Sequence, residues 1–146
     1  MTPITRTLLA GTALGLLHTP LAAQTVINTA RTTPVVTSTV NAGQPADVRI
    51  DTAGSVTVMS GTAVTVDSNN SVTNAGAIKI SNADNAVGIR VTAGRTANIA
   101  NSGTITIDET YTATDSDNDG DLDGPFAPGT GRPAILIEGA LPGTLR

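Results

Sequence analysis

The stretch Val72-Thr73-Asn74-Ala75-Gly76-Ala77-Ile78-Lys79-Ile80 recurs 27 residues later as Ile99-Ala100-Asn101-Ser102-Gly103-Thr104-Ile105-Thr106-Ile107. The β-branched, Asn and Gly positions keep their chemistry and their spacing. A fixed period of this length indicates a repeat architecture, in which each unit buries its apolar face by stacking on its neighbours. Because the unit is short, β-branched and punctuated by Asn and Gly, we predict an all-β fold, a right-handed parallel β-helix (solenoid).

The sequence upstream of this repeat alternates in the same way. Apolar pairs that enclose one polar residue begin eight residues apart, at Val48-Arg49-Ile50, Val56-Thr57-Val58 and Val64-Thr65-Val66. Gly, Asn and Asp between the pairs are turn residues. Three such steps nearly equal the later period, so we interpret one rung as three strands and expect about four to five rungs. An antiparallel sandwich or meander has similar spacing and remains an alternative.

One rung carries an insertion. Its third strand, Ala134–Ile137, lies 46 residues after the corresponding Gly88–Val91, whereas the other strands shift by 27. The difference predicts about 19 extra residues within the segment 109–132. Insertions of this kind form loops on one face of a solenoid, often the binding face.

The chain divides into three parts. Residues 1–23 resemble a secretory signal peptide, with Arg6, the apolar run Leu8–Leu17 and small residues ending at Ala22-Ala23. An N-terminal core helix is the alternative. We expect 24–45 to form an N-terminal cap or irregular segment, and 46–146 to form the β-helix with its insertion. The protein is therefore expected to be exported.

Asn74 and Asn101 occupy the same repeat position, each two residues before a glycine. Their side chains either stack as a hydrogen-bonded ladder or form simple Asn-x-Gly turns. We expect Gly76 and Gly103 to supply a positive φ at a sharp corner.

Composition restricts the chemistry. The sequence has no Cys and no Trp, and its one histidine, His18, lies in the predicted signal peptide. Disulfides and thiolate metal sites are excluded, and no histidine of the mature chain can activate a Ser or Thr. We therefore predict no catalytic and no cofactor-binding residues, and no basic surface for nucleic acid.

The one chemical motif is acidic. Asp115, Asp117, Asp119, Asp121 and Asp123 alternate with other residues, and Gly120 allows a sharp turn. The spacing matches the start of an EF-hand loop, in which alternate carboxylates surround one calcium ion. In this arrangement Asp121 would contribute its backbone carbonyl. We predict that these five aspartates bind calcium, with a solvated acidic turn as the alternative.

The motif departs from an EF-hand at its end. Phe126 stands where a bidentate Glu is expected, and Pro125 and Pro128 follow the loop instead of a helix. We therefore expect affinity of about 10⁻⁴–10⁻³ M, as in extracellular modules.

The rungs Val72–Ile80 and Ile99–Ile107, the acidic run Asp115–Phe126 and the signal peptide together resemble the N-terminal part of an autotransporter passenger of Gram-negative, alphaproteobacterial type. The resemblance implies a β-helix exported through a C-terminal outer-membrane β-barrel and displayed at the cell surface. No barrel-like segment is present up to Arg146, so we expect the chain to be a fragment of such a protein.

Three functions follow as hypotheses. The first is a surface-displayed structural or adhesive solenoid, without catalysis, that contacts an unknown surface or host ligand. The second is a soluble secreted calcium-binding module. The third, a fragment of a polysaccharide-degrading β-helix enzyme, lacks paired carboxylates, since Asp108 and Glu109 are expected on opposite faces of a strand. Self-association through the uncapped end is also expected.

Overall fold

The computed structural model describes residues 23–110, 112–124 and 129–146. The predicted signal peptide lies outside them, apart from Ala23. The secondary structure that they form is β-strand only, and they contain no helix that could cross a membrane.

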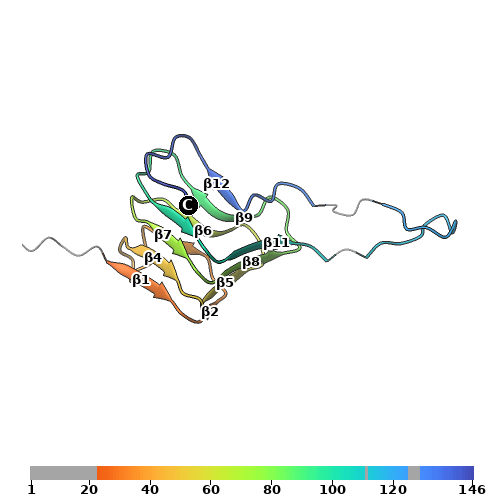
Figure 1. Cartoon of the computed structure of the whole chain (residues 1–146), viewed down its shortest axis with the longest axis horizontal. Coiled ribbons are helices and arrows are strands. Elements are labelled where there is room, and N and C mark those ends of the chain that lie inside the picture. Colours follow the sequence, from red (N-terminus) through yellow and green to blue (C-terminus); the bar gives the residue numbers. More distant parts are fainter. Residues whose placement is uncertain (1–22, 111, 125–128) are drawn as a thin grey trace, which may run out of the picture.

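The strands of the described residues fall into three parallel four-stranded sheets, which form the sides of a solenoid of stacked rungs (Figure 1). The strands are β1 (Gln24–Ile27), β2 (Ala30–Arg31), β3 (Val35–Val36), β4 (Asp47–Ile50), β5 (Ser55–Val58), β6 (Thr62–Val66), β7 (Val72–Asn74), β8 (Ala77–Ser81), β9 (Val87–Val91), β10 (Ile99–Asn101), β11 (Thr104–Asp108) and β12 (Ile135–Ile137). The sheets are β1-β4-β7-β10, β2-β5-β8-β11 and β3-β6-β9-β12, so every third strand returns to the same sheet.

The pairing confirms the parallel solenoid and contradicts the antiparallel alternative. Val72 pairs with Ile99 and Ile78 with Ile105, in the register of the 27-residue repeat. From β1 to β10 the chain makes about three full turns, slightly fewer than the expected four to five. We call β1–β3 the first rung and β10–β12 the last rung.

The segment 24–45, expected as a cap or irregular segment, is partly strand-like. It contributes β1, β2 and β3, which pair in parallel with β4, β5 and β6. The residues after β3 return to the stack through the bond from the Ala46 amide to the Thr37 carbonyl, 3.0 Å long.

The core is a set of columns of Val and Ile that point into the stack from successive rungs. Alternate residues of a strand face opposite sides, which is why the inward positions are two apart. Val56 and Ile78 are adjacent members of one such column, and both are fully buried. Each fully buried side chain of this kind stabilises the fold by roughly 1.5–3 kcal/mol.

The asparagines form the predicted ladder. The buried Asn74 side chain donates to Asn101 Oδ1 over 2.7 Å, and its own Oδ1 accepts the Gly76 amide at 3.2 Å. The ladder and the Asn-x-Gly turn are therefore both present.

The expected positive φ at Gly76 and Gly103 is wrong, because neither glycine adopts one. The residues are needed for close packing instead. A Cβ at Gly76 would lie 2.2 Å from the Gly54 carbonyl oxygen, and a Cβ at Gly103 would lie 2.1 Å from the Gly76 carbonyl oxygen. The three glycines form a column in which each backbone touches the next.

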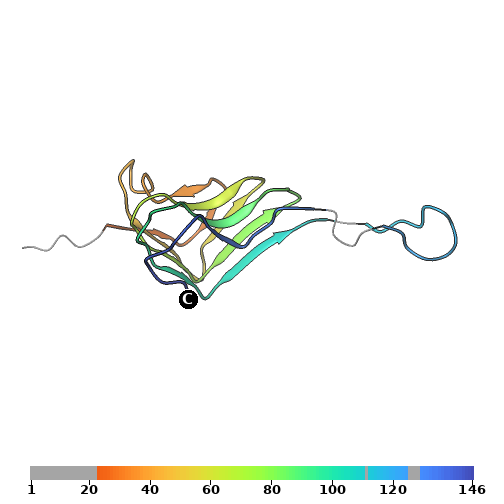
Figure 2. The same ribbon diagram turned by 90° about the horizontal axis from the view of Figure 1, so that it is seen from above.

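The insertion leaves the stack between β11 and β12. Ile135 pairs with Ile89 and Ile137 with Val91, which confirms the alignment across the 46-residue shift. We call residues 109–132 the arm. Both views show it projecting sideways, away from the solenoid (Figures 1 and 2).

Candidate functional site: the arm

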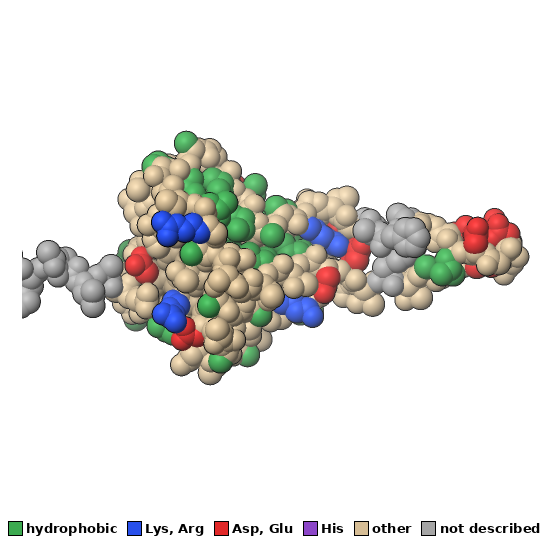
Figure 3. Space-filling view, in the orientation of Figure 1, with side chains coloured by type: hydrophobic (Ala, Val, Ile, Leu, Met, Phe, Trp, Pro, Cys, Tyr) green, Lys and Arg blue, Asp and Glu red, His purple; other side chains and the backbone are tan. Residues whose placement is uncertain are grey.

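A group of acidic side chains lies at the far end of the arm, well away from the strands (Figure 3). The arm therefore has two parts with different chemistry, a base that contacts the solenoid and a tip that carries the aspartates.

The base is clamped by Arg132. Its guanidinium lies 2.8 Å from Glu109 Oε2 and 3.2 Å from Asp84 Oδ1, and its Nε donates to the Ala83 carbonyl at 2.9 Å. The side chains of Arg132 and Glu109 are only 16% and 13% exposed. The Arg132–Glu109 pair joins the returning leg of the arm to the outgoing leg, and the bonds from Arg132 to Asp84 and Ala83 join it to the turn before β9.

Backbone contacts extend this clamp. The Gly129 amide donates to Glu109 Oε2 at 3.0 Å, and the Thr130 amide donates to Asp84 Oδ1 at 2.9 Å. The Asn85 amide in turn donates to the Thr130 carbonyl at 2.9 Å. The other carboxylate oxygen of Glu109 is buried without a hydrogen-bond partner among the described residues. Removing Arg132 would thus leave a largely buried carboxylate without its counter-charge.

The tip is closed at its neck by an antiparallel bridge between Thr114 and Asp123. The Asp123 amide donates to the Thr114 carbonyl at 2.8 Å, and the Ser116 amide donates to Asp123 Oδ2 at 2.7 Å. Hydrogen bonds from the Ser116 hydroxyl and amide lower the pKa of Asp123 below its usual range. Asp123 is therefore held as a carboxylate facing the loop.

Within the neck the chain turns sharply at Asn118 and Gly120, with φ of 60° and 97°. The Asp119 and Gly120 amides donate to the two Asp115 oxygens at 3.2 and 3.1 Å. The sharp turn expected at Gly120 is present, and it directs backbone amides at the Asp115 carboxylate.

Three of the five predicted calcium ligands come together. One carboxylate oxygen each of Asp115, Asp117 and Asp123 lies within 4.8 Å of the others. Asp119 and Asp121 are not members of this group; the Asp119 carboxylate accepts the Asp121 amide at 3.1 Å. The residues at which the motif departs from an EF-hand lie outside the described residues; they are Pro125, Phe126 and Pro128.

Acidic residues of the solenoid body have structural partners. Asp108 accepts a bond from Ser81 while its neighbour Glu109 belongs to the clamp, so the two carboxylates serve different contacts. Burial alone would raise the pKa of Asp67, but hydrogen bonds from Ser38 and Thr37 outweigh it and the pKa is lowered.

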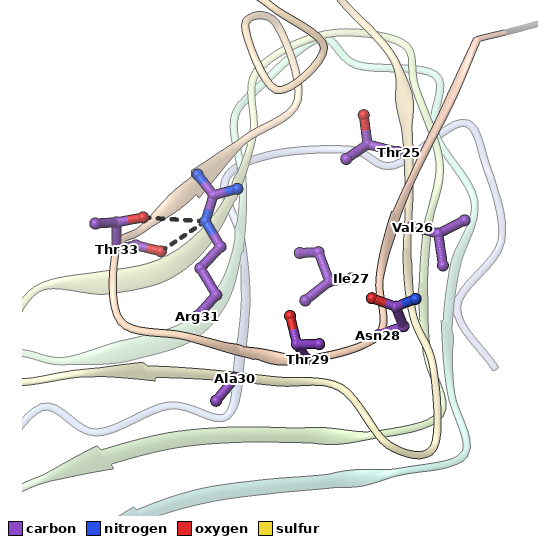
Figure 4. A pocket seen from close by; sticks show the side chains of 8 residues that line it. All are labelled: Thr25, Val26, Ile27, Asn28, Thr29, Ala30, Arg31 and Thr33. Atoms are coloured by element: carbon purple, nitrogen blue, oxygen red, sulfur yellow. Dashed lines mark hydrogen bonds between the residues drawn. The ribbon is translucent and has the colours of Figure 1, made fainter.

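An open depression of about 500 Å³ lies at the N-terminal end of the stack (Figure 4). It is lined by Thr25, Val26, Ile27, Asn28, Thr29, Ala30, Arg31 and Thr33. Its one ionisable side chain, Arg31, donates to Thr33 and Pro34 of the same rung.

The clamp was not predicted from the sequence. Its partners are 23 and 48 residues apart and meet only because the insertion leaves one rung and returns to it. The sequence signal nearest to the clamp was the difference between the 27-residue and the 46-residue repeat shifts. That difference located the two legs of the arm but did not identify the residues that join them.

Comparison with known proteins gives no relative. No protein-family model, no curated protein and no solved structure matches the chain.

Proposed function

We propose that the protein is a non-catalytic structural solenoid that presents the arm to a binding partner. The observation that carries this proposal is the clamped, projecting arm. The low-exposure Arg132–Glu109 pair joins the two legs of the arm, contacts of Arg132 with Asp84 and Ala83 tie the base to the rungs, and the tip places five aspartates away from the body. Solenoids commonly bind partners through loops that a rigid scaffold of stacked rungs holds in place.

The proposed setting is the bacterial cell surface or the extracellular space. The signal-like residues 1–23 and the resemblance of the rungs to autotransporter passengers support export. In this setting the chain would be the exported part of an outer-membrane autotransporter, and the partner would be a surface or host ligand.

An attachment assay tests this function. The full chain is immobilised on beads, and retention of the beads on cell monolayers and extracellular-matrix proteins is measured. A tip variant with Asp117→Asn, Asp119→Asn and Asp121→Asn should lose retention, whereas Asp51→Asn on the solenoid body should retain it. Beads that never attach, or attach equally with both variants, would contradict an adhesive role for the arm.

The second candidate function is calcium binding by the tip. The proximity of the Asp115, Asp117 and Asp123 oxygens supports it, because calcium takes six to eight oxygen ligands and mutual repulsion loosens the loop without a cation. Backbone carbonyls and water would complete the shell.

Limited proteolysis with calcium or with a chelator distinguishes this candidate. We expect calcium to protect residues 109–132, with half-maximal protection at about 10⁻⁴–10⁻³ M. Asp115→Asn or Asp123→Asn should abolish protection, and Asp121→Asn, outside the three-residue group, serves as the matched control. Identical cleavage in both conditions would exclude the site.

The enzyme alternative has the least support. The adjacent acids Asp108 and Glu109 bind different partners, whereas glycoside hydrolysis needs two carboxylates flanking one bond. Release of sugar fragments from pectin-like or other acidic glycans would establish it in place of the structural function.

A further inference from the structure

The tip of the arm holds the two Asp-Gly pairs of the sequence, Asp119-Gly120 and Asp123-Gly124. In such a pair the backbone nitrogen of the glycine can attack the side-chain carboxyl of the aspartate, because glycine has no Cβ to hinder the approach. Figure 2 shows the tip as a loop at the far end of the arm, beyond the solenoid. Differences in reactivity between the two pairs therefore depend on the groups of the loop that surround each carboxyl.

The Asp119-Gly120 pair is open to this attack. Both residues are exposed, and Gly120 has a φ of +97° with nothing within 4 Å of the position that a Cβ would take. The Asp119 carboxylate accepts the Asp121 amide at 3.1 Å. This bond folds the side chain forward along its own backbone, beside Gly120, which is the residue whose nitrogen would attack.

A base lies within reach of the attacking nitrogen. The Gly120 amide donates to Asp115 Oδ2 at 3.1 Å, a distance at which a carboxylate can take the proton that the nitrogen must lose. The Asp119 amide donates to the other oxygen, Asp115 Oδ1, at 3.2 Å, which holds this carboxylate in place. The turn at Asn118 and Gly120 therefore brings together the nucleophile, the electrophile and the base of one reaction.

The Asp123-Gly124 pair has different surroundings. The Asp123 carboxylate accepts the Ser116 amide at 2.7 Å and the Ser116 hydroxyl, so it is held across the neck of the tip. Hydrogen bonds from the Ser116 hydroxyl and amide also lower the pKa of Asp123 and keep it ionised. An ionised carboxylate is a poor electrophile, because oxide instead of water would have to leave. The Asp123 amide is fixed as well, by its bond to the Thr114 carbonyl at 2.8 Å.

We propose that Asp119 is a site of isoaspartate formation, an intramolecular modification in which Asp115 is the base and water is the only co-reactant. The Gly120 nitrogen bonds to Cγ of the protonated Asp119 side chain while its proton passes to Asp115. The bond from Cγ to the hydroxyl then breaks, Asp115 returns the proton, and one water departs from the new succinimide ring. A second water opens this ring at the Asp119 main-chain carbonyl, which leaves Gly120 joined through Cγ and frees the α-carboxylate.

The modification changes the shape of the tip and leaves its charge unchanged, because one carboxyl is consumed and another is freed. The backbone then runs through the Asp119 side chain and is one methylene longer. The Gly120 amide no longer follows the turn that directs it at Asp115, so the Asp115 carboxylate loses one of the donors that hold it. The sequence has no Asn-Gly pair and no further Asp-Gly pair, so the solenoid has no site of the same kind.

Incubation of the full chain in warm, mildly acidic buffer tests the proposal. Peptide mapping with electron-transfer fragmentation locates isoaspartate, since it distinguishes the two linkages although their masses are equal. We expect isoaspartate to form at Asp119 several-fold faster than at Asp123. In urea, where the contacts of the tip are lost, the two pairs should react at similar rates. Equal rates in the native chain, a faster reaction at Asp123, or a preference that persists unchanged in urea would each overturn the proposal.

Substitutions in the same loop test the role of the base. Asp115→Asn keeps an oxygen acceptor for the Gly120 amide but cannot take its proton, so the reaction at Asp119 should slow several-fold. The matched control, Asp121→Asn, also removes one charge and should leave that rate nearly unchanged. Ser116→Ala should accelerate the reaction at Asp123, because a hydroxyl that keeps this carboxylate ionised is gone. An unchanged rate in Asp115→Asn, or equal slowing in Asp115→Asn and Asp121→Asn, would mean that Asp115 is not the base.

Discussion

At the scale of single residues, stacking decides which side chains the chain can accept. Gly54, Gly76 and Gly103 lack space for a Cβ because a backbone carbonyl of the preceding rung lies 1.9–2.2 Å from where it would be. Gly94 differs, since it has a φ of +74° and nothing within 4 Å of its Cβ position. One glycine type is needed for packing between rungs and the other for a local turn.

This difference predicts unequal costs for two alanine substitutions. Gly94→Ala should lower the free energy of unfolding by about 1–2 kcal/mol, the cost of a left-handed backbone conformation. Gly76→Ala should cost more, about 3 kcal/mol or above, because two neighbouring carbonyls must move. Urea unfolding measures both values. A Gly76→Ala variant as stable as Gly94→Ala would contradict the packing argument.

Asp67 makes the free energy of unfolding depend on pH in the acidic range. Its carboxylate accepts bonds from the Thr37 hydroxyl and from the Ser38 amide and hydroxyl, and its pKa lies below the ordinary 3.8. A lowered pKa contributes stability that is present above the unfolded-state value and is lost as the pH falls through the folded-state value. Unfolding measured from neutral to strongly acidic pH should therefore show a loss below about 3.8 that Asp67→Asn reduces. An unchanged pH profile in Asp67→Asn would count against this role.

At the scale of elements, the arm depends on ion pairs of Arg132 that join the two legs of the insertion to each other and to the rungs. Arg132→Ala should open the base, because it removes the counter-charge of a mostly buried Glu109, at a cost on the order of 3 kcal/mol. The matched control is Arg90→Ala, which breaks the Arg90–Glu138 pair. That pair is 43% and 36% exposed and should contribute only about 0–1 kcal/mol.

Limited proteolysis within 109–132 measures this opening. Cleavage should accelerate strongly in Arg132→Ala and little in Arg90→Ala. Equal acceleration in the two variants would mean that Arg132 does not hold the arm.

The elements themselves could be predicted because their positions repeat. The register of β10 and β11 on β7 and β8 follows directly from a constant shift of 27, and the arm follows from the larger shift before β12. The role of Gly76 could not be predicted, since its close contacts come from the preceding rung and not from its own turn. The clamp and the separation of Asp119 and Asp121 from the other aspartates depend on how the legs and the tip fold back, which no repeat encodes.

At the scale of the whole molecule, stability should be distributed unevenly along the stack. In a solenoid the total is approximately a sum of terms within rungs and between neighbouring rungs. Ile78 has Val56 on one side and Ile105 on the other and is fully buried, whereas Ile105 pairs with a neighbour on one side among the described residues. An inner position thus contributes to two interfaces and an end position to one.

Alanine substitution at these two members of one column tests this distribution. In dilute solution, Ile78→Ala should cost about 2–5 kcal/mol, typical of a buried isoleucine, and Ile105→Ala roughly half as much. Equal costs at the two positions in dilute solution would contradict a nearest-neighbour stack, since both residues would then experience the same surroundings.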